Sequence, residues 1–186
     1  MIIENQSFSK TKFESNSIAK EYEDCEFDQC NFSNTDLTDV MFIECSFNNC
    51  DLSNSSLNNT SFKDVSFNNC KMLGLHFENC NQFLIEMRFD KCILNFSSFY
   101  QLKLKGIRFT KCQLQEVDFT NADLTNSTFM DCDLLKSVFE NTIIENADFF
   151  TAYNYSFDPD LNYLTKAKFS KEQVIGLLAK FDIDIS

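Results

Sequence analysis

The sequence predicts an all-β solenoid of stacked square coils, capped at its C-terminal end by a short α-helix. Three observations predict this fold. Large apolar residues recur every five positions, smaller residues between them share that period, and sites twenty residues apart carry matching side chains. A helix repeats about every 3.6 residues and a strand about every 2, so neither produces a period of five.

The large apolar site occurs at 24 positions, each of which is Phe, Leu, Met or Ile. These positions run from Phe27 to Phe77 and, after a two-residue insertion, from Phe89 to Phe149. A small or medium side chain stands two residues before most of them, and Asn stands two residues after them ten times. Asn and Gly tolerate a positive φ at a turn. Each five-residue unit is therefore expected to be a short straight segment that ends in a turn.

Four such turns close a square coil, and stacked coils place residue i above residue i+20. The resulting columns are uniform, because one contains only phenylalanine and another only cysteine. The phenylalanine column is Phe27, Phe47, Phe67, Phe89, Phe109, Phe129 and Phe149. The cysteine column is Cys30, Cys50, Cys70, Cys92, Cys112 and Cys132. The five-residue period alone does not require columns this uniform, whereas stacking does.

In this repeat the chain resembles the pentapeptide repeat proteins, whose fold is a right-handed quadrilateral β-helix. Ile3, Phe8, Phe13 and Ile18 continue the pattern upstream, so the resemblance covers most of the chain. We assign residues 1–153 to the pentapeptide-repeat β-helix and residues 154–186 to a C-terminal loop and helix.

The C-terminal helix is expected to begin at Ser170 as N-cap, with Gln173 completing a capping box. Its apolar residues are Val174, Ile175, Leu177, Leu178 and Phe181. Such a set can cover the last coil, as every solenoid requires, or it can join two chains.

The tail also looks like that of the microcin self-immunity and Qnr-type proteins. The similarity lies in Asp158-Pro159-x-x-Asn162 and Ala167-x-Phe169-Ser170. This resemblance implies that the helix joins two rods tail to tail, and it favours a homodimer.

All nine cysteines fall in the small inward register. This placement favours buried thiols over disulfides or a zinc site. The N-terminal residues do not form a signal peptide and no apolar run approaches about 18 residues, so we expect a cytoplasmic protein that does not span a membrane. The lone histidine, His76, lies in an outward register. Since no nucleophile with an adjacent base and no desolvated carboxylate pair is recognisable, we expect no enzyme, no cofactor and no metal.

The net charge of −12 argues against direct binding of nucleic acid or of an anionic membrane. The charge is uneven, at −9 over residues 1–87, +5 over 88–111 and −8 over 112–186. Asp28, Asp51 and Asp64 are expected on one face of the rod as an acidic partner-binding surface. The basic belt comprises Arg88, Lys91, Lys103, Lys105, Arg108 and Lys111, and an apolar patch comprises Ile93, Phe96 and Tyr100.

The resemblance implies a function for the acidic surface. In the branch that contains the Qnr and mycobacterial quinolone-resistance proteins, an acidic rod mimics DNA and binds DNA gyrase or topoisomerase IV. The resemblance therefore implies a non-enzymatic protein-binding rod that modulates quinolone susceptibility. The basic belt interrupts the acidic surface, and the short insertion near residues 81–86 makes the chain more similar to the loop-free mycobacterial type. The alternative is a scaffold or adaptor that binds an unrelated protein through the apolar patch.

Overall fold

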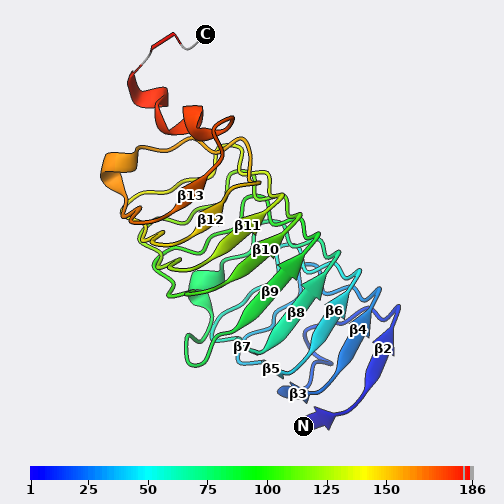
Figure 1. The fold of residues 1–186 in the computed structure, drawn as a ribbon. Coiled ribbons are helices and arrows are strands. Elements are labelled where there is room, and N and C mark those ends of the chain that lie inside the picture. The colour runs from blue at the N-terminus through cyan, green and yellow to red at the C-terminus, as the bar shows by residue number, and fades with distance from the viewer. Residues whose placement is uncertain (182, 185–186) are drawn as a thin grey trace.

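The structure, a computed structural model, describes residues 1–181, 183 and 184. The described chain forms a rod of stacked four-sided coils with the two termini at opposite ends (Figure 1). The first side carries sheet A in its N-terminal half. Its four parallel strands are β1 (Ile2–Glu4), β3 (Glu21–Glu23), β5 (Met41–Ile43) and β7 (Ser61–Lys63).

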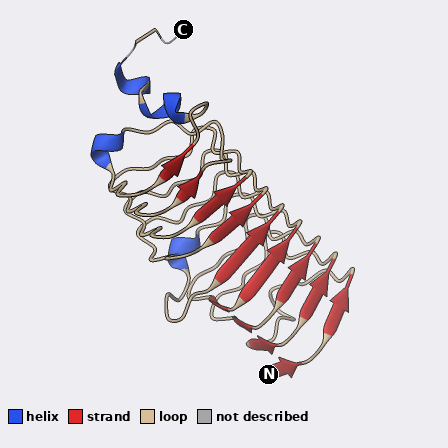
Figure 2. Ribbon diagram, viewed as in Figure 1, coloured by secondary structure: helices blue, strands red, loops and turns tan. Residues whose placement is uncertain are grey.

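The second side carries sheet B, a nine-stranded parallel sheet that runs along the whole rod (Figure 2). Its strands are β2 (Ser7–Ser9), β4 (Glu26–Asp28), β6 (Ser46–Asn48), β8 (Val65–Asn68), β9 (Met87–Asp90), β10 (Arg108–Thr110), β11 (Thr128–Met130), β12 (Asp148–Phe149) and β13 (Lys168–Phe169). The strands are only two to four residues long because the chain turns every five residues.

Isolated parallel bridges join successive coils on the other two sides. The third side runs from Lys12 to Tyr153, and the fourth side includes the bridge between Asp118 and Val138. The predicted all-β solenoid is therefore confirmed. Bridges and strand pairs continue beyond the expected domain boundary at residue 153, since Phe149 pairs with Phe169.

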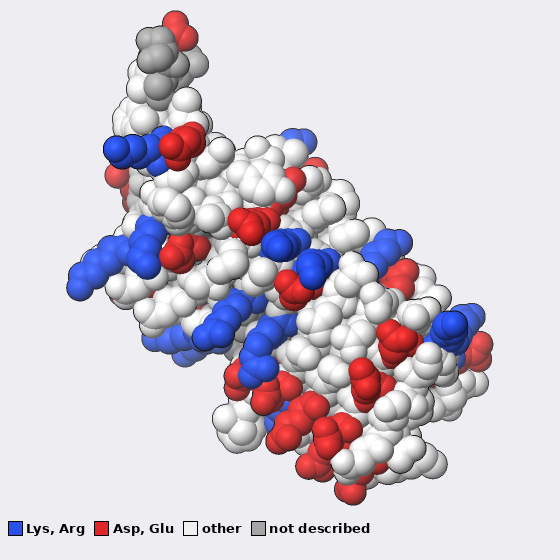
Figure 3. Space-filling view, turned by 45° about the vertical axis from the view of Figure 1, so that its right-hand side comes forward, with Lys and Arg blue, Asp and Glu red and all other residues white. Residues whose placement is uncertain are grey.

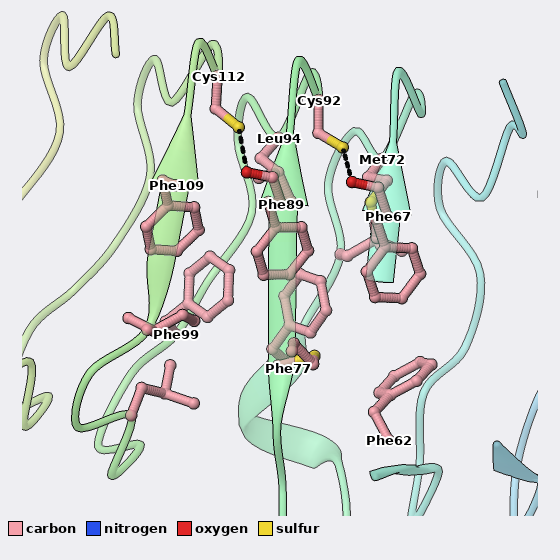
Figure 4. Packing of buried hydrophobic residues seen from close by; sticks show 14 of the residues in the cluster. Phe62, Phe67, Met72, Phe77, Phe89, Cys92, Leu94, Phe99, Phe109 and Cys112 are labelled. Atoms are coloured by element: carbon pink, nitrogen blue, oxygen red, sulfur yellow. Dashed lines mark hydrogen bonds between the residues drawn. The ribbon is translucent and has the colours of Figure 1, made fainter. Parts of the chain in front are cut away.

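The predicted phenylalanine column is confirmed. Phe67 pairs directly with Phe89, so the two-residue insertion lies between them and shifts the register by two. The rings stack through the rod, with centroids 5.2 Å apart between Phe89 and Phe109 and 5.3 Å apart between Phe109 and Phe129. Neighbouring columns meet edge to face, as Phe99 and Phe109 do at 5.7 Å. Figure 4 shows Phe67, Phe89, Phe99 and Phe109 in the interior.

The corners follow the predicted turn register. Of the 24 residues that stand two positions after a large apolar site, all but Asn79 and Thr151 have a positive φ. Asn79 ends a short 3₁₀ helix, η1 (Phe77–Asn79). Asn is therefore common at the corners because it tolerates this conformation better than other side chains.

The small inward residues hydrogen-bond the coil beneath them. The Cys92 thiol donates to the carbonyl of Phe67 at 3.3 Å, as Figure 4 shows, and the Ser55 hydroxyl donates to Phe32 at 2.8 Å. All nine cysteines are free and buried. Burial raises the pKa of Cys45 to about 11, so that thiol stays protonated and is a poor nucleophile at neutral pH.

The C-terminal segment is helical but differs from the predicted α-helix. Its described part forms two short 3₁₀ helices, η3 (Val174–Leu177) and η4 (Ala179–Phe181), which follow η2 (Pro159–Leu161). The Ser170 hydroxyl accepts from Gln173 N–H at 3.2 Å. The Gln173 side chain, however, accepts from Asn154 N–H at 3.3 Å, so the capping box is only half formed. Gly176, a weak helix former, also disfavours a continuous α-helix.

Candidate protein-binding surfaces

The three acidic residues expected on one face lie on different parts of the rod. Asp28 ends β4 on sheet B, Asp51 lies in the bridged column of the third side, and Asp64 lies at the corner between sheets A and B. The expectation that they share a face is therefore wrong. It failed because they occupy different registers within the 20-residue coil.

A continuous series of carboxylates lies instead at the corner between sheets A and B. We call this series the acidic edge, and it consists of Asp24, Glu44, Asp64 and Glu86. Its members are exposed and follow one another coil by coil, at a spacing of about 4.8 Å per coil. Figure 3 shows carboxylates gathered on the part of the rod toward the N-terminus. The sequence contains this column as acids about 20 residues apart. The net charge of whole segments did not reveal it, because each segment combines all registers of the coil.

The basic belt occupies two adjoining sides in the middle of the rod. Arg88 and Arg108 are paired neighbours on β9 and β10, and Lys103 and Lys105 lie on the first side beyond sheet A. Lys91 and Lys111 lie at the corner that follows sheet B. Figure 3 shows Lys and Arg side chains grouped across the middle of this face.

Ion pairs join the belt to nearby carboxylates. The Arg88 guanidinium lies 2.6 Å from Asp64 and 3.3 Å from Glu86, at the end of the acidic edge. The Lys105 ammonium lies 3.2 Å from Asp123. Burial works to raise the pKa of Asp123, but hydrogen bonds from Thr125 and from Lys105 outweigh it and leave this pKa below its usual range. Lys103, Arg108 and Lys111 have no ion pair among residues 1–181, 183 and 184.

The predicted apolar patch wraps around one corner. Ile93 is half-buried on the third side, Phe96 is 58% exposed at the next corner, and Tyr100 is exposed on the fourth side. Phe96 has a φ of 64°. This backbone conformation is unfavourable for a bulky residue, so Phe96 combines an exposed aromatic ring with a strained backbone.

Replacing Phe96 by asparagine is expected to stabilise the protein by about 0.5–1 kcal/mol, because Asn adopts a positive φ more easily. Urea unfolding measures the difference. Asn121→Phe, at another corner with a φ of 59°, is the reverse control and should destabilise the protein. A loss of stability in Phe96→Asn would show that packing of the Phe96 ring outweighs the backbone strain.

The C-terminal residues assigned to a dimer helix divide into two groups. Leu177 is buried against the last coil and Leu178 is half-buried, whereas Val174, Ile175 and Phe181 are 38%, 50% and 56% exposed. Capping of the coil therefore uses only part of the apolar set.

A second apolar surface lies around the last coils and was not predicted. Met130 and Phe150, on neighbouring coils of the sheet B side, are 53% and 59% exposed and line a hollow of about 470 Å³. Leu135, Tyr153 and Tyr163 expose apolar surface on other sides. Sequence reasoning missed Met130 and Phe150 because the same register is polar in the earlier coils, from Asp28 to Thr110.

Among residues 1–181, 183 and 184, the remaining polar groups do not assemble a recognisable reaction centre. The His76 ring lies 2.9 Å from the Glu78 carboxylate at the surface, whereas Cys80 is buried. Within the described chain, no three His, Cys, Asp or Glu side chains are grouped to hold a metal ion. None of the described helices is long and apolar enough to cross a membrane.

Comparisons with known proteins agree with this fold. Two trypsin-treated forms of QnrB1, a plasmid-mediated fluoroquinolone resistance protein, are similar over 100% of both chains. They show 18% and 20% sequence identity with TM-scores of 0.55 and 0.50. No curated protein matches the chain. A family model described as a pentapeptide repeat region matches residues 20–82 and 74–149. Because these matches span most of the sequence, the chain belongs to the pentapeptide repeat family.

Proposed function

We propose that this chain is a non-enzymatic protein-binding rod whose acidic edge enters the cationic DNA-binding channel of a type II topoisomerase. The observation that carries this proposal is the linear order of Asp24, Glu44, Asp64 and Glu86 along one corner of a rigid solenoid. A regular line of negative charge is what a channel built to bind DNA phosphates attracts. Acids on the adjoining strands, among them Glu23 and Glu26, strengthen this field.

The basic belt limits how far along the rod the acidic edge can resemble the phosphates of DNA. Arg88 already pairs with Asp64 and Glu86, so the part of the acidic edge without such a neighbour is its N-terminal end. We therefore place the contact with the topoisomerase on the first coils. The similarity to a fluoroquinolone resistance protein supports DNA gyrase as the first enzyme to test.

Neutralising the acidic edge is expected to weaken inhibition of DNA gyrase supercoiling at least about tenfold. The variant is Asp24→Asn, Glu44→Asn and Asp64→Asn. All three corners have φ values of 48–52°, where Asn is well tolerated, so the fold should persist. The measurement is a supercoiling assay with purified gyrase, with and without a fluoroquinolone, at two salt concentrations.

A matched control removes three carboxylates from other edges. Asp39→Asn, Glu116→Asn and Asp131→Asn change the same charge at exposed corners with φ values of 53–62°. This control should inhibit as the unmodified chain does. An equal loss of inhibition in both variants would mean that inhibition depends only on net charge and not on the acidic edge. Absence of inhibition by the unmodified chain would contradict the proposal.

The second candidate is a scaffold that binds an unrelated protein. The observation that favours it is the exposed ring of Phe96 on a strained backbone. An aromatic residue kept at an unfavourable corner conformation is typical of a contact site. Binding through this patch should be lost in Phe96→Ser and should tolerate salt. Binding through the acidic edge should instead be lost at high salt.

We also propose a homodimer joined at the C-terminal end, in the cytoplasm. Val174, Ile175 and Phe181 leave apolar surface uncovered there, and Met130 and Phe150 expose further apolar surface on the last coils. Patches of this kind mark protein contacts. Sedimentation of the chain and of the variant Val174→Asp with Ile175→Asp tests this interface, and an unchanged mass would contradict it.

A further inference from the structure

The hydrogen-bond ladder of the first side is open beneath residues 103–105. In the next coil, Asp123 N–H donates to the carbonyl of Leu102 and the Asp123 carbonyl accepts from Leu104 N–H, both at 2.8 Å. Ile143 repeats the same two bonds one coil further on. Lys103 occupies the equivalent position, yet neither its N–H nor its carbonyl has a hydrogen-bond partner among the described residues.

The cause is the two-residue insertion. Asn81 N–H and Glu86 N–H donate to carbonyls of the coil beneath, which holds both ends of this segment against the rod. Between them, Phe83 and Leu84 are 69% and 66% exposed, and the chain turns outward (Figure 1). Residues 81–86 therefore do not continue the ladder from β7 to Lys103.

A groove lies where the ladder is open, at the corner between the first side and sheet B. Its volume is about 630 Å³, and it is lined by residues 85–88 from one coil and 104–108 from the next. Leu104 and Ile107 are buried apolar residues, and Ile85 is half-buried. The charged residues of the groove are Arg88, Lys105, Arg108 and Glu86. Arg88 is already paired with Glu86 and Asp64, so Lys105 and Arg108 give the groove its cationic character.

This groove combines three properties that an added β-strand requires. Unpaired backbone groups of Lys103, next to the lining residue Leu104, offer ladder hydrogen bonds. Half-buried Ile85 offers an apolar contact, and Lys105 and Arg108 favour an acidic segment. Arg108 has no ion pair within the described chain, and Lys105 has one, to Asp123. The occupant expected on these grounds is extended, acidic on one face and apolar on the other.

We propose that residues 181–185 of a second copy of this chain bind in the groove as an added strand. Their sequence, Phe181-Asp182-Ile183-Asp184-Ile185, alternates apolar and acidic residues. In an extended strand, successive side chains point to opposite faces. The apolar face would contact Ile85 and its neighbours, and the carboxylates would face the cations. Ile183 is 57% exposed in the single chain, while residues 182 and 185 lie outside the described part.

The test is fluorescence anisotropy of a labelled synthetic peptide with the sequence of residues 179–186, titrated with the full chain at low salt. Saturable binding is expected, weakened at least about tenfold by Lys105→Glu with Arg108→Glu. The control Lys136→Glu with Lys171→Glu makes the same charge change at exposed sites outside the groove and should bind as the unmodified chain does.

Two further peptides separate strand addition from attraction of charge alone. A peptide N-methylated at alternate backbone amides keeps its charges but cannot complete a ladder, so it should lose binding. A peptide of the same composition with Ile-Ile-Asp-Asp in place of Asp-Ile-Asp-Ile should also lose it. Equal binding of either peptide, equal weakening in the control variant, or no saturation by millimolar chain would overturn the proposal. None of these outcomes depends on gyrase or on the acidic edge.

Discussion

Replacing Phe109 by alanine is expected to lower the free energy of unfolding by about 3–5 kcal/mol. The Phe109 ring is 0% exposed and is stacked between Phe89 and Phe129, with Phe99 against its edge. The coils above and below are held by backbone ladders, so they cannot collapse into the space that the ring leaves. Urea unfolding followed by circular dichroism measures the loss.

Phe83→Ala serves as the matched control, because it removes the same side chain from a surface position. Phe83 is 69% exposed, so its replacement should cost about 0.5 kcal/mol or less. A loss below about 1 kcal/mol in Phe109→Ala would contradict the stacked core.

Replacing Gly176 by alanine is expected to release the C-terminal 3₁₀ turns, at a cost of about 1–3 kcal/mol. A Cβ atom at Gly176 would lie 1.9 Å from the carbonyl oxygen of Tyr155 and 3.0 Å from its carbon. Both are backbone atoms of the last coil, so they cannot rotate away as a side chain can. Leu177, buried next to this contact, would lose its cover of the coil. Hydrogen exchange of residues 170–181 should therefore accelerate.

Gly106→Ala is the control for the steric contact at Gly176, because a Cβ atom at Gly106 meets no neighbouring atom. No atom lies within 4 Å of a Cβ at Gly106, although its φ is +74°. The expected cost is about 1 kcal/mol from the backbone conformation alone. Exchange of residues 170–181 should not change in this variant. Unchanged exchange in Gly176→Ala as well would show that the turns do not rest on Tyr155.

The interior could be predicted because each inward register repeats down the rod. One Phe every twenty residues specifies both the stacking partner and its side of the coil, so the pairing of Phe67 with Phe89 followed from counting. Corner turns were equally accessible, since Asn marks a positive φ. In each case a local preference and a long-range contact are encoded by the same residue.

The outer surface was harder to predict, because the spatial neighbours of a surface residue are determined by its register in the coil and not by proximity in sequence. Asp28 and Asp64 are both acidic and early in the chain, yet they lie on different sides, whereas Asp24, Glu44 and Asp64 share one corner. The open ladder at Lys103 could not be foreseen, because an insertion of two residues does not reveal which hydrogen bonds are lost. The C-terminal segment had the apolar pattern of a helix, but contact of Gly176 with Tyr155 favours shorter turns.

The break on the first side also divides the rod into two blocks with reduced coupling. In a solenoid, each coil is stabilised only by the coils next to it, so cooperativity passes from neighbour to neighbour. The coil that holds Met72 is joined to the coil that holds Leu94 by sheet B and by two bridges, Lys71 to Ile93 and His76 to Ser98. These contacts transmit the cooperativity, whereas the open ladder of the first side does not. Unfolding is therefore expected to pause at this boundary, so that one block melts before the other.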